Sequence, residues 1–331
     1  MMSTAILAAQ TVSKSFKVRG NGPFSPPLQQ LRAVDAVSLD ISTGETLGIA
    51  GESGCGKSTF ARLIAGLLQP DSGSIKFHGA DIRLLDRDLY RMFRRSVQMI
   101  FQDPFSSLNP RMRIGDSIAE PLLINKLCDK QHVRSRTAVL MEQVGLSPDQ
   151  YDRFPHEFSG GQRQRIGIAR ALAVQPTVLV ADEPVSSLDI SIQAQIINLL
   201  LELKQQHGLS ILMISHDLGV LRHICDRIAV MYLGSVVELA PAQKLFRQCR
   251  HPYTQALLAA IPGIHDTPKD DDHAVVLPDL QSVGAQTNGC RFHPRCAYAQ
   301  DICRQEQPPL LEQQPNHQVA CHLSKELFPL G

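Results

Sequence analysis

The most informative segment of this sequence is the run Ile49-Ala50-Gly51-Glu52-Ser53-Gly54-Cys55-Gly56-Lys57-Ser58-Thr59. It fits G-x-x-x-x-G-K-[ST], the pattern of phosphate-binding loops. Residues 47–50 have the composition of a short buried strand, and apolar side chains recur at helical spacing over residues 60–68. A glycine-rich turn of chance origin is the alternative, and the order strand, loop, helix argues against it.

The residue types of this loop suit an anion. Gly51, Gly54 and Gly56 permit backbone conformations that are closed to other residues, so successive N–H groups can surround a phosphate. The helix that follows directs its positive end at the same anion. Lys57 is placed to reach the β- and γ-phosphates of a nucleotide, and the Ser58 hydroxyl to ligate Mg²⁺. The loop therefore predicts binding of a nucleoside triphosphate with magnesium.

The composition is typical of a soluble globular protein. Of the 331 residues, 43% are apolar and 20% are charged, and the formal net charge is +1. So small a net charge gives no electrostatic argument for nucleic acid or an anionic membrane as a partner. No run of about eighteen apolar residues is present, and residues 1–7 lack the features of a signal peptide. We therefore expect a protein of the cytoplasm, with one large α/β domain and an appendage or with two domains.

Polar side chains follow three segments that have the composition of strands. They are Gln102, the pair Asp182 and Glu183, and His216. The carboxyl ends of strands are where open α/β sheets place ligand contacts, and alternating strands and helices over residues 44–233 predict a largely parallel sheet. Taken singly, Gln102 is more usually explained as a solvated strand end, and His216 as a structural histidine. The acidic pair is more informative, because burying it is costly unless it meets cations or a reacting water.

Two further β-rich segments precede the phosphate loop, at residues 6–18 and 33–41. Phe16 lies in the first of them. Its ring is suited to stack on an adenine base, since every base offers a π-face. A phenylalanine of the core is the alternative and is about equally supported by the sequence.

Residues 103–158 lack strand patterns and carry helical periodicity, which predicts a helical insertion. The run Ser159-Gly160-Gly161-Gln162 follows. Ser159 is placed to cap the next helix, and the two glycines permit close approach of an anion.

Cysteines concentrate near the end of the chain. Four of the eight, with spacing C-x₅-C-x₆-C-x₁₇-C, fall in its last part: Cys290, Cys296, Cys303 and Cys321. Disulfides are rare in the reducing cytoplasm, so we do not expect these cysteines to form them. Four thiolates can hold a tetrahedral Zn²⁺ or an iron–sulfur cluster, although the C-x₂-C pairs of most structural zinc sites are absent from the sequence. Free thiols are the third interpretation.

Together these motifs make the sequence resemble the ATPase subunits of ABC transporters. The phosphate loop, Gln102, residues 159–162, residues 178–183, residues 187–189 and His216 match that family's motifs in order and approximate spacing. Helicases, GTPases and kinases share a phosphate loop, but the Ser-Gly-Gly-Gln signature is far more specific. The resemblance implies an α/β fold of the ABC-type P-loop ATPases, with a mainly parallel core sheet, an antiparallel β subdomain, a helical insertion and a small cysteine-containing extension at the C-terminus.

The resemblance also assigns residues to the nucleotide. Those implied to contact the ATP of this subunit are Phe16, Gly51, Ser53, Gly54, Cys55, Gly56, Lys57, Ser58, Thr59, Gln102 and Asp182. Within this set, Ser58, Gln102 and Asp182 would hold Mg²⁺. Catalysis would fall to Glu183, which activates water, together with His216 and Gln102.

In the family, two ATPase domains form a head-to-tail sandwich around ATP. By resemblance, the residues on the signature side of the sandwich are Ser159, Gly160, Gly161, Gln162 and Asp189. Ser159 and Gly161 would then serve the nucleotide of a partner subunit. Phe158 stands where leucine is commoner in the family, and we expect it to be anchored in the core.

Residues 101–110, 183–189 and 250–258 narrow the resemblance to the ATPases of dipeptide, oligopeptide and nickel importers, and most closely to the second ATPase of dipeptide permeases. This implies peripheral attachment to the cytoplasmic face of the cell membrane, with two transmembrane permease subunits, a second ATPase subunit, identical or merely homologous, and an extracytoplasmic substrate-binding protein. Dipeptides, longer peptides and nickel chelates are not distinguished. An ABC ATPase acting on DNA or ribosomes is the rival, but the sequence lacks the long coiled-coil insertion or tandem ATPase domain usual there.

The resemblance suggests a domain division and a content for the cysteine cluster. We expect a nucleotide-binding domain over residues 1–262 and an extension over residues 263–331, beginning with a solvated connector around Asp270–Asp272. Some members of the subfamily associate a tail of this cysteine spacing with a [4Fe–4S] cluster, which favours the cluster over zinc. Folding support and redox gating of the ATPase are the two roles we consider for it.

Overall fold

The computed structural model describes residues 5–18, 29–103, 107–261 and 288–329. The phosphate loop lies between a strand and a helix, as predicted. Strand β3 (Thr46–Ala50) is buried at every position, and helix α1 (Lys57–Ile64) begins within the loop motif. The helix ends earlier than the apolar pattern over 60–68 predicts, because Gly66 takes a left-handed conformation with φ of 66° and turns the chain.

The main sheet has the order β11-β12-β10-β9-β3-β8-β7-β6. From β9 to β6 neighbouring strands are parallel, which confirms the predicted parallel core. The other strands of this parallel core are β6 (Val97–Ile100), β7 (Val178–Asp182), β8 (Ser210–Ile214) and β9 (Arg227–Tyr232). β7 and β8 are as fully buried as β3, because helices cover the sheet as in other parallel α/β folds.

A second, antiparallel sheet has the order β2-β1-β4-β5. Its strands are β1 (Ala5–Val18), β2 (Gln29–Ser42), β4 (Ser72–Phe77) and β5 (Ala80–Asp81). This sheet confirms the two predicted β-rich segments. Its apolar side chains, Val12 and Val34 among them, share one core with Phe60 of α1 and Ile49 of β3. The antiparallel sheet therefore backs the phosphate loop.

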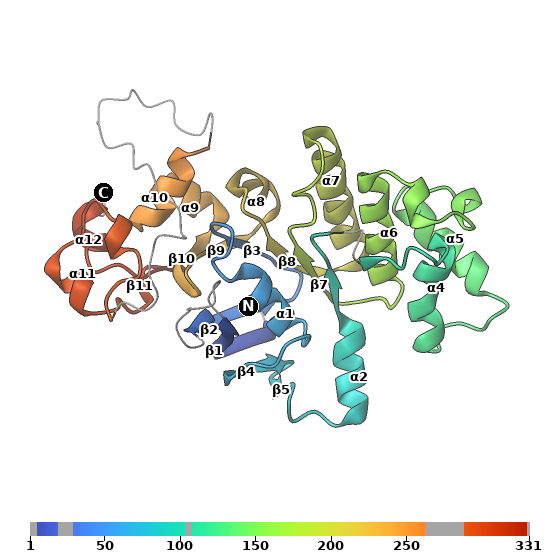
Figure 1. Cartoon of the computed structure of the whole chain (residues 1–331), viewed down its shortest axis with the longest axis horizontal. Helices are drawn as coiled ribbons and strands as arrows, with labels where there is room; N and C mark the ends of the chain where they lie inside the picture. The colour runs from blue at the N-terminus through green and yellow to red at the C-terminus, as the bar shows by residue number, and fades with distance from the viewer. Residues whose placement is uncertain (1–4, 19–28, 104–106, 262–287, 330–331) are drawn as a thin grey trace, which may run out of the picture.

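Helices gather at one end of the molecule, where α4, α5 and α6 lie side by side (Figure 1). The described part of residues 103–158 contains α4 (Ile114–Ile124), α5 (Val133–Gln143) and two 3₁₀ turns, η1 (Pro148–Gln150) and η2 (Pro155–Glu157). Helix α6 (Gly160–Leu172) follows the signature. The other helices of the nucleotide-binding region are α2 (Arg87–Ser96), α7 (Ile190–His207), α8 (Leu218–Ile224), α9 (Ala242–Arg247) and α10 (Pro252–Ala259).

The cysteine extension lies at the opposite end, coloured red in Figure 1, and continues the main sheet. Its elements are η4 (His293–Arg295), α11 (Asp301–Gln305), β11 (Leu311–Gln314), β12 (His317–Val319) and α12 (Ser324–Leu327). Strand β12 pairs antiparallel with β10 (Ser235–Pro241), which joins the extension to the core. No sequence pattern predicts this pairing. The expected boundary at 262–263 and the connector around Asp270–Asp272 lie outside the described residues.

Across the described ranges, no helix is both long and apolar enough to cross a membrane.

Candidate nucleotide site

The phosphate loop opens on a cavity of about 1290 Å³. Residues from both sheets line it, including Phe16 of β1, residues 53–59, Gln102 and Glu183. Gln102, Glu183 and His216 follow β6, β7 and β8 within two residues of each strand's end. Since these strands are parallel, their carboxyl ends meet at one edge of the sheet. The fold thus brings together the strand-end residues that the sequence singled out.

Glycine is required at two positions of the loop by close backbone approach. Gly51 and Gly56 have φ of 150° and 108°. A Cβ on Gly51 would stand 2.3 Å from the Met231 carbonyl oxygen, and one on Gly56 would stand 2.0 Å from that of Ala33. Any side chain there would force the loop away from its neighbours.

Lys57 clasps the loop from within. Its Nζ donates to the carbonyl oxygens of Gly51, at 2.8 Å, and Glu52, at 2.9 Å, and its side chain is 3% exposed. The same ammonium lies 3.9 Å from Glu183 Oε1. A buried cation at the N-terminus of α1 adds to the helix dipole, so this end of the cavity attracts an anion.

Asp182 and Ser58 form a pair suited to a hard cation. The Ser58 hydroxyl donates to Asp182 Oδ1 at 2.8 Å. Burial raises the pKa of Asp182, which the Ser58 hydrogen bond opposes and the neighbouring Glu183 charge reinforces. A carboxylate desolvated in this way gains from a cation beside it, and oxygen ligands are those that Mg²⁺ prefers.

Glu183 is held by side chains from the neighbouring strand ends. Gln102 Nε2 donates to its Oε2 at 2.8 Å, and His216 Nδ1 lies 3.4 Å from the same oxygen. Glu183 itself has φ of 45°, a left-handed conformation that is uncommon for a residue with a side chain. Its backbone N–H donates to the Ile214 carbonyl at 3.0 Å, which fixes this turn. Backbone strain of this kind often marks a functional position.

Phe16 and Cys55 differ in their access to the cavity. Phe16 lines the cavity and is 38% exposed, so its ring is available to a ligand and is not the buried core residue of the alternative interpretation. Cys55 is 1% exposed, and burial raises the pKa of its thiol, an effect that Lys57 opposes. Cys55 therefore offers its backbone N–H to the loop, while its thiol packs in the core.

The signature lies away from this cavity. Ser159 caps α6 by accepting from the Gln162 N–H at 3.3 Å, while Gln162 Oε1 accepts from the Ser159 N–H at 3.0 Å. None of residues 159–162 is among the residues described as lining the cavity, and Figure 1 shows α6 grouped with α4 and α5. Asp189, just before α7, is exposed as well. Phe158 is 3% exposed, which confirms its predicted anchoring in the core.

The four cysteines of the extension line one small cavity, together with Phe292 and Leu323. Burial raises the pKa of the Cys290, Cys296 and Cys321 thiols, the last to about 12. Backbone N–H groups oppose this rise at each of the three. As the described residues stand, no three His, Cys, Asp or Glu side chains are close enough to hold one metal ion.

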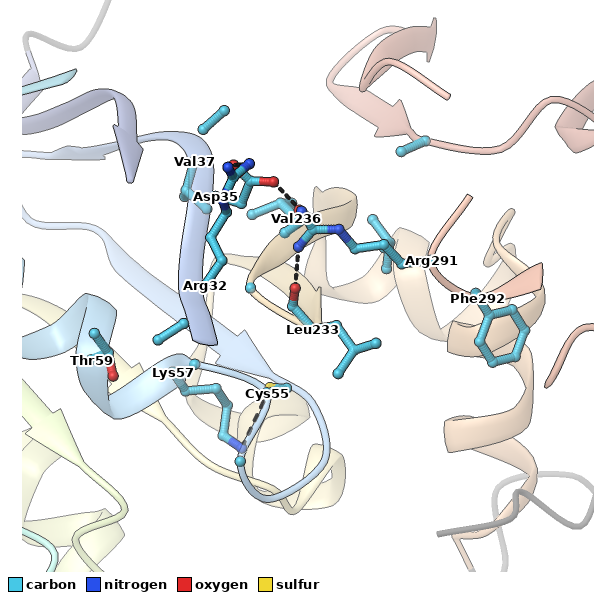
Figure 2. A pocket seen from close by; sticks show the side chains of 18 of the residues that line it. Arg32, Asp35, Val37, Cys55, Lys57, Thr59, Leu233, Val236, Arg291 and Phe292 are labelled. Atoms are coloured by element: carbon cyan, nitrogen blue, oxygen red, sulfur yellow. Dashed lines mark hydrogen bonds and ion pairs between the residues drawn. The ribbon is translucent and has the colours of Figure 1, made fainter. Parts of the chain in front are cut away.

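Residues of the extension also line the nucleotide cavity. No sequence pattern predicts their presence there. Arg291 donates to the Asp35 carboxylate and to the Leu233 carbonyl, and Figure 2 shows it reaching toward β2, across the cavity from Lys57. Asp35 is separated from Arg291 by 256 positions, so local sequence patterns carry no signal for this contact.

Family models match two parts of the chain. A model described as "ABC transporter" matches residues 34–186. A second, described as "Oligopeptide/dipeptide transporter, C-terminal region", matches residues 237–303. The first contains the phosphate loop, the signature and the acidic pair, and the second reaches the first three cysteines of the extension.

Curated relatives are similar over nearly the whole chain. The "Di/tripeptide transport ATP-binding protein DppF" of Pseudomonas aeruginosa is 46% identical, covering 98% of this chain and 99% of the relative. The "Oligopeptide transport ATP-binding protein AppF" of Bacillus subtilis is 47% identical, covering 96% of this chain and 97% of the relative.

Solved structures show the same fold. A dimeric ATP-binding cassette in a post-hydrolysis state, bound to ADP and phosphate, matches with a TM-score of 0.63 and 28% identity, covering 71% of this chain and 98% of its own. CbiO1 from Clostridium perfringens, part of an ABC transporter complex, matches with a TM-score of 0.62 and 27% identity, covering 74% of this chain and 91% of its own.

Proposed function

This chain belongs to the ATP-binding subunits of ABC-type peptide importers, and we propose that Glu183 activates the water with which it hydrolyses ATP. The function is the hydrolysis of ATP to ADP and phosphate to power import of dipeptides or oligopeptides. One observation carries the assignment of Glu183. Its carboxylate lies on the cavity of the phosphate loop, bonded to Gln102 and within 3.4 Å of His216.

The chemistry follows from what surrounds this carboxylate. A general base must lie within hydrogen-bond reach of the proton it accepts, and Glu183 is oriented by Gln102 at the edge where the γ-phosphate of bound ATP would lie. Lys57 supplies a fixed positive charge to the phosphates. His216, half exposed beside Glu183, is placed to contact the same phosphate.

The residues present fit a magnesium ion. Ser58 and Asp182 provide a hydroxyl and a desolvated carboxylate 2.8 Å apart, and Gln102 provides an amide oxygen at the next strand end. When bound, Mg²⁺ polarises the phosphate oxygens of ATP. Phe16 and residues 51–59 would hold the adenine and the phosphates themselves.

The position of the signature supports a site completed by a second ATPase subunit. Ser159 caps a helix that begins at Gly160, and none of residues 159–162 is among the described residues that line this chain's own cavity. An exposed helix N-terminus is suited to a phosphate. We assign these residues, with the exposed Asp189, to the nucleotide of an identical or homologous partner.

The remaining partners follow from the family. Two transmembrane permease subunits would form the path for the peptide, and an extracytoplasmic binding protein would deliver it. The chain would sit on the cytoplasmic face of the membrane. Its net charge of +1 supports no role for nucleic acid.

For the four cysteines of the extension we propose a [4Fe–4S] cluster over Zn²⁺. Cys290, Cys296, Cys303 and Cys321 line one cavity, and backbone N–H groups at three of them oppose the rise in thiol pKa that burial causes. These four thiolates would hold such a cluster, and the C-x₂-C pairs of most structural zinc sites are absent from the sequence. When bound, the cluster would support the fold of the extension.

Peptide uptake into proteoliposomes tests the proposed function. Vesicles would contain this chain with its co-purified permeases and second ATPase, with ATP supplied on the side of the ATPase subunits and labelled dipeptide with the binding protein on the other. We expect uptake that requires both ATP and this chain. Uptake that proceeds equally without this chain, or ATP hydrolysis that no peptide stimulates, would contradict the assignment.

A further inference from the structure

An ion pair joins the cysteine extension to the phosphate loop. Arg295 donates from both terminal nitrogens to the Glu52 carboxylate, each at 2.9 Å. The Arg295 side chain is 2% exposed and that of Glu52 is 22% exposed. A bidentate pair of this kind is both strong and geometrically specific. It spans 243 positions of the chain.

Glu52 is held at its backbone as well. Its N–H donates to the Tyr253 hydroxyl at 2.9 Å, and its carbonyl accepts from Lys57 Nζ at 2.9 Å. The residue that anchors Lys57 is therefore the residue that Arg295 holds. A displacement of Glu52 moves one of the two carbonyls that position the phosphate-binding lysine.

Arg295 is in turn placed by the cysteine segment. It ends the turn η4, one residue before Cys296, and its N–H donates to the Phe292 carbonyl at 2.9 Å. The rings of Phe292, Tyr232 and Tyr253 pack together with centroids 4.7–5.4 Å apart. The Tyr232 hydroxyl accepts from Arg295 at 3.4 Å. The Phe292 ring, which lines the cysteine cavity, thus packs against the tyrosine that contacts the guanidinium.

The charge of this pair matters for ATP. Residues 51–58 contain a single carboxylate, that of Glu52, inside a loop whose purpose is to bind phosphates. An uncompensated carboxylate there would repel the nucleotide. Arg295 neutralises it from the side of the extension, leaving Lys57 and the helix N-terminus to attract the phosphates.

We infer that Arg295 is a positioning residue for ATP binding, which neutralises and orients Glu52 and so makes the nucleotide affinity of the phosphate loop depend on the fold of the cysteine extension. The role concerns this chain's own side chains and holds whichever metal the thiolates bind. It is distinct from the assignment of Glu183, because ATP binding is measured separately from hydrolysis.

Titration of the full chain with a fluorescent ATP analogue in the presence of Mg²⁺ tests this inference. Arg295→Ala should weaken binding about tenfold or more, because it removes two hydrogen bonds between charged groups and exposes the phosphates to an unpaired carboxylate. Arg304→Ala, which removes an exposed arginine of the same extension, is the matched control and should bind like the parent. Parental affinity of Arg295→Ala would overturn the inference.

The double variant Glu52→Gln/Arg295→Ala separates charge from folding. Removing both partners leaves no unpaired carboxylate, so its affinity should return to within about threefold of the parent. A double variant as weak as Arg295→Ala would overturn the inference, since the arginine would then act through something other than Glu52. If Arg295→Ala fails to fold, Arg295→Lys replaces it: it keeps the charge without the bidentate geometry and should bind with intermediate affinity, whereas parental affinity would contradict the role.

The dependence on the extension has its own test in Cys296→Ser. It should weaken ATP binding in the parent, because it disturbs the segment that places Arg295, and should add no loss in Glu52→Gln/Arg295→Ala. Equal losses in both backgrounds would contradict transmission through Arg295.

Discussion

Around the phosphate loop, side chains from neighbouring parallel strands meet because those strands end at one edge of the sheet. The cysteine extension, in contrast, reaches the same loop through long side chains that come from the far end of the chain. Lys57 Nζ lies 3.9 Å from Glu183 Oε1, and Ser58 donates to Asp182 at 2.8 Å. The order of the strands brings these partners together. Arg291 and Arg295 instead cross from a separate set of short elements. Residues of both regions line the same cavity, but the two regions differ in how the sequence specifies their contacts.

We therefore expect different roles for the two regions: the strand-end cluster carries out the chemistry, and the extension supports it. The phosphate loop and the strand-end cluster carry the groups of this chain that we propose bind phosphate, hold a cation and orient water. The extension adds no such group, and its contacts fix the position and the charge of groups that belong to the loop. Changes in the cluster should therefore abolish binding or turnover, and changes in the extension should lower affinity or local stability.

The largest effect that sharpens this comparison is expected at Gly56. Gly56→Ala would place a Cβ 2.0 Å from a backbone oxygen at φ of 108°, which should cost about 2–4 kcal/mol of folding free energy and prevent ATP binding. Gly54→Ala is the matched control, because its φ is also positive but its Cβ would meet nothing within 4 Å, so about 1 kcal/mol is expected. Urea unfolding and ATP titration measure both. Equal effects of the two variants would show that close packing of the loop is unimportant.

A smaller effect on ATP binding, with a local loss of stability, is expected where the extension joins the core. Glu238 Oε1 lies 2.7 Å from His317 Nε2 and accepts from the Arg250 N–H at 2.6 Å, and the side chains of Glu238 and His317 are fully buried. Glu238→Ala leaves both groups unpaired and should cost about 3 kcal/mol. Hydrogen exchange should then speed up along the β10–β12 ladder.

Glu326→Ala, on the exposed surface of the same extension, is the control for this prediction and should leave exchange unchanged. Unaltered exchange at β12 in Glu238→Ala would mean that the sheet pairing alone holds the extension.

The smallest effect on turnover is expected at the cysteines. Cys303→Ser, at the most buried of the four, should abolish bound iron and visible absorption while changing kcat at saturating ATP by less than about twofold, with KM raised. Metal analysis and steady-state kinetics measure this, and Cys128→Ser, outside the extension, is the control. A large fall in kcat would make the extension part of the catalytic machinery and favour redox gating.

Much of the nucleotide cluster was predictable from the sequence. The phosphate loop is contiguous, and Gln102, Asp182, Glu183 and His216 each follow a recognisable strand, so the parallel topology alone brings them together. The separation of the signature from the cavity agrees with the arrangement that the family resemblance implies.

The supporting contacts were not predictable in this way. Glu52 occupies a variable position of the loop pattern, and Tyr253 and Arg295 lie in segments without periodicity that points to the loop. Glu52, the partner of both, lies 201 positions from Tyr253 and 243 positions from Arg295. At such separations only tertiary packing decides which side chains meet. The strands β11 and β12 are short and partly polar, so their addition to the sheet edge also left no clear pattern.

The central claim, that Glu183 activates water in a site shared by two ATPase subunits, is tested most directly by Glu183→Gln. This variant keeps the hydrogen-bonding shape but loses the base, so single-turnover hydrolysis should fall by about 10²-fold or more while ATP binding persists and an ATP-bound dimer accumulates on gel filtration. Glu202→Gln, an exposed glutamate of α7, should behave like the parent. Hydrolysis at the parental rate by Glu183→Gln would contradict the account.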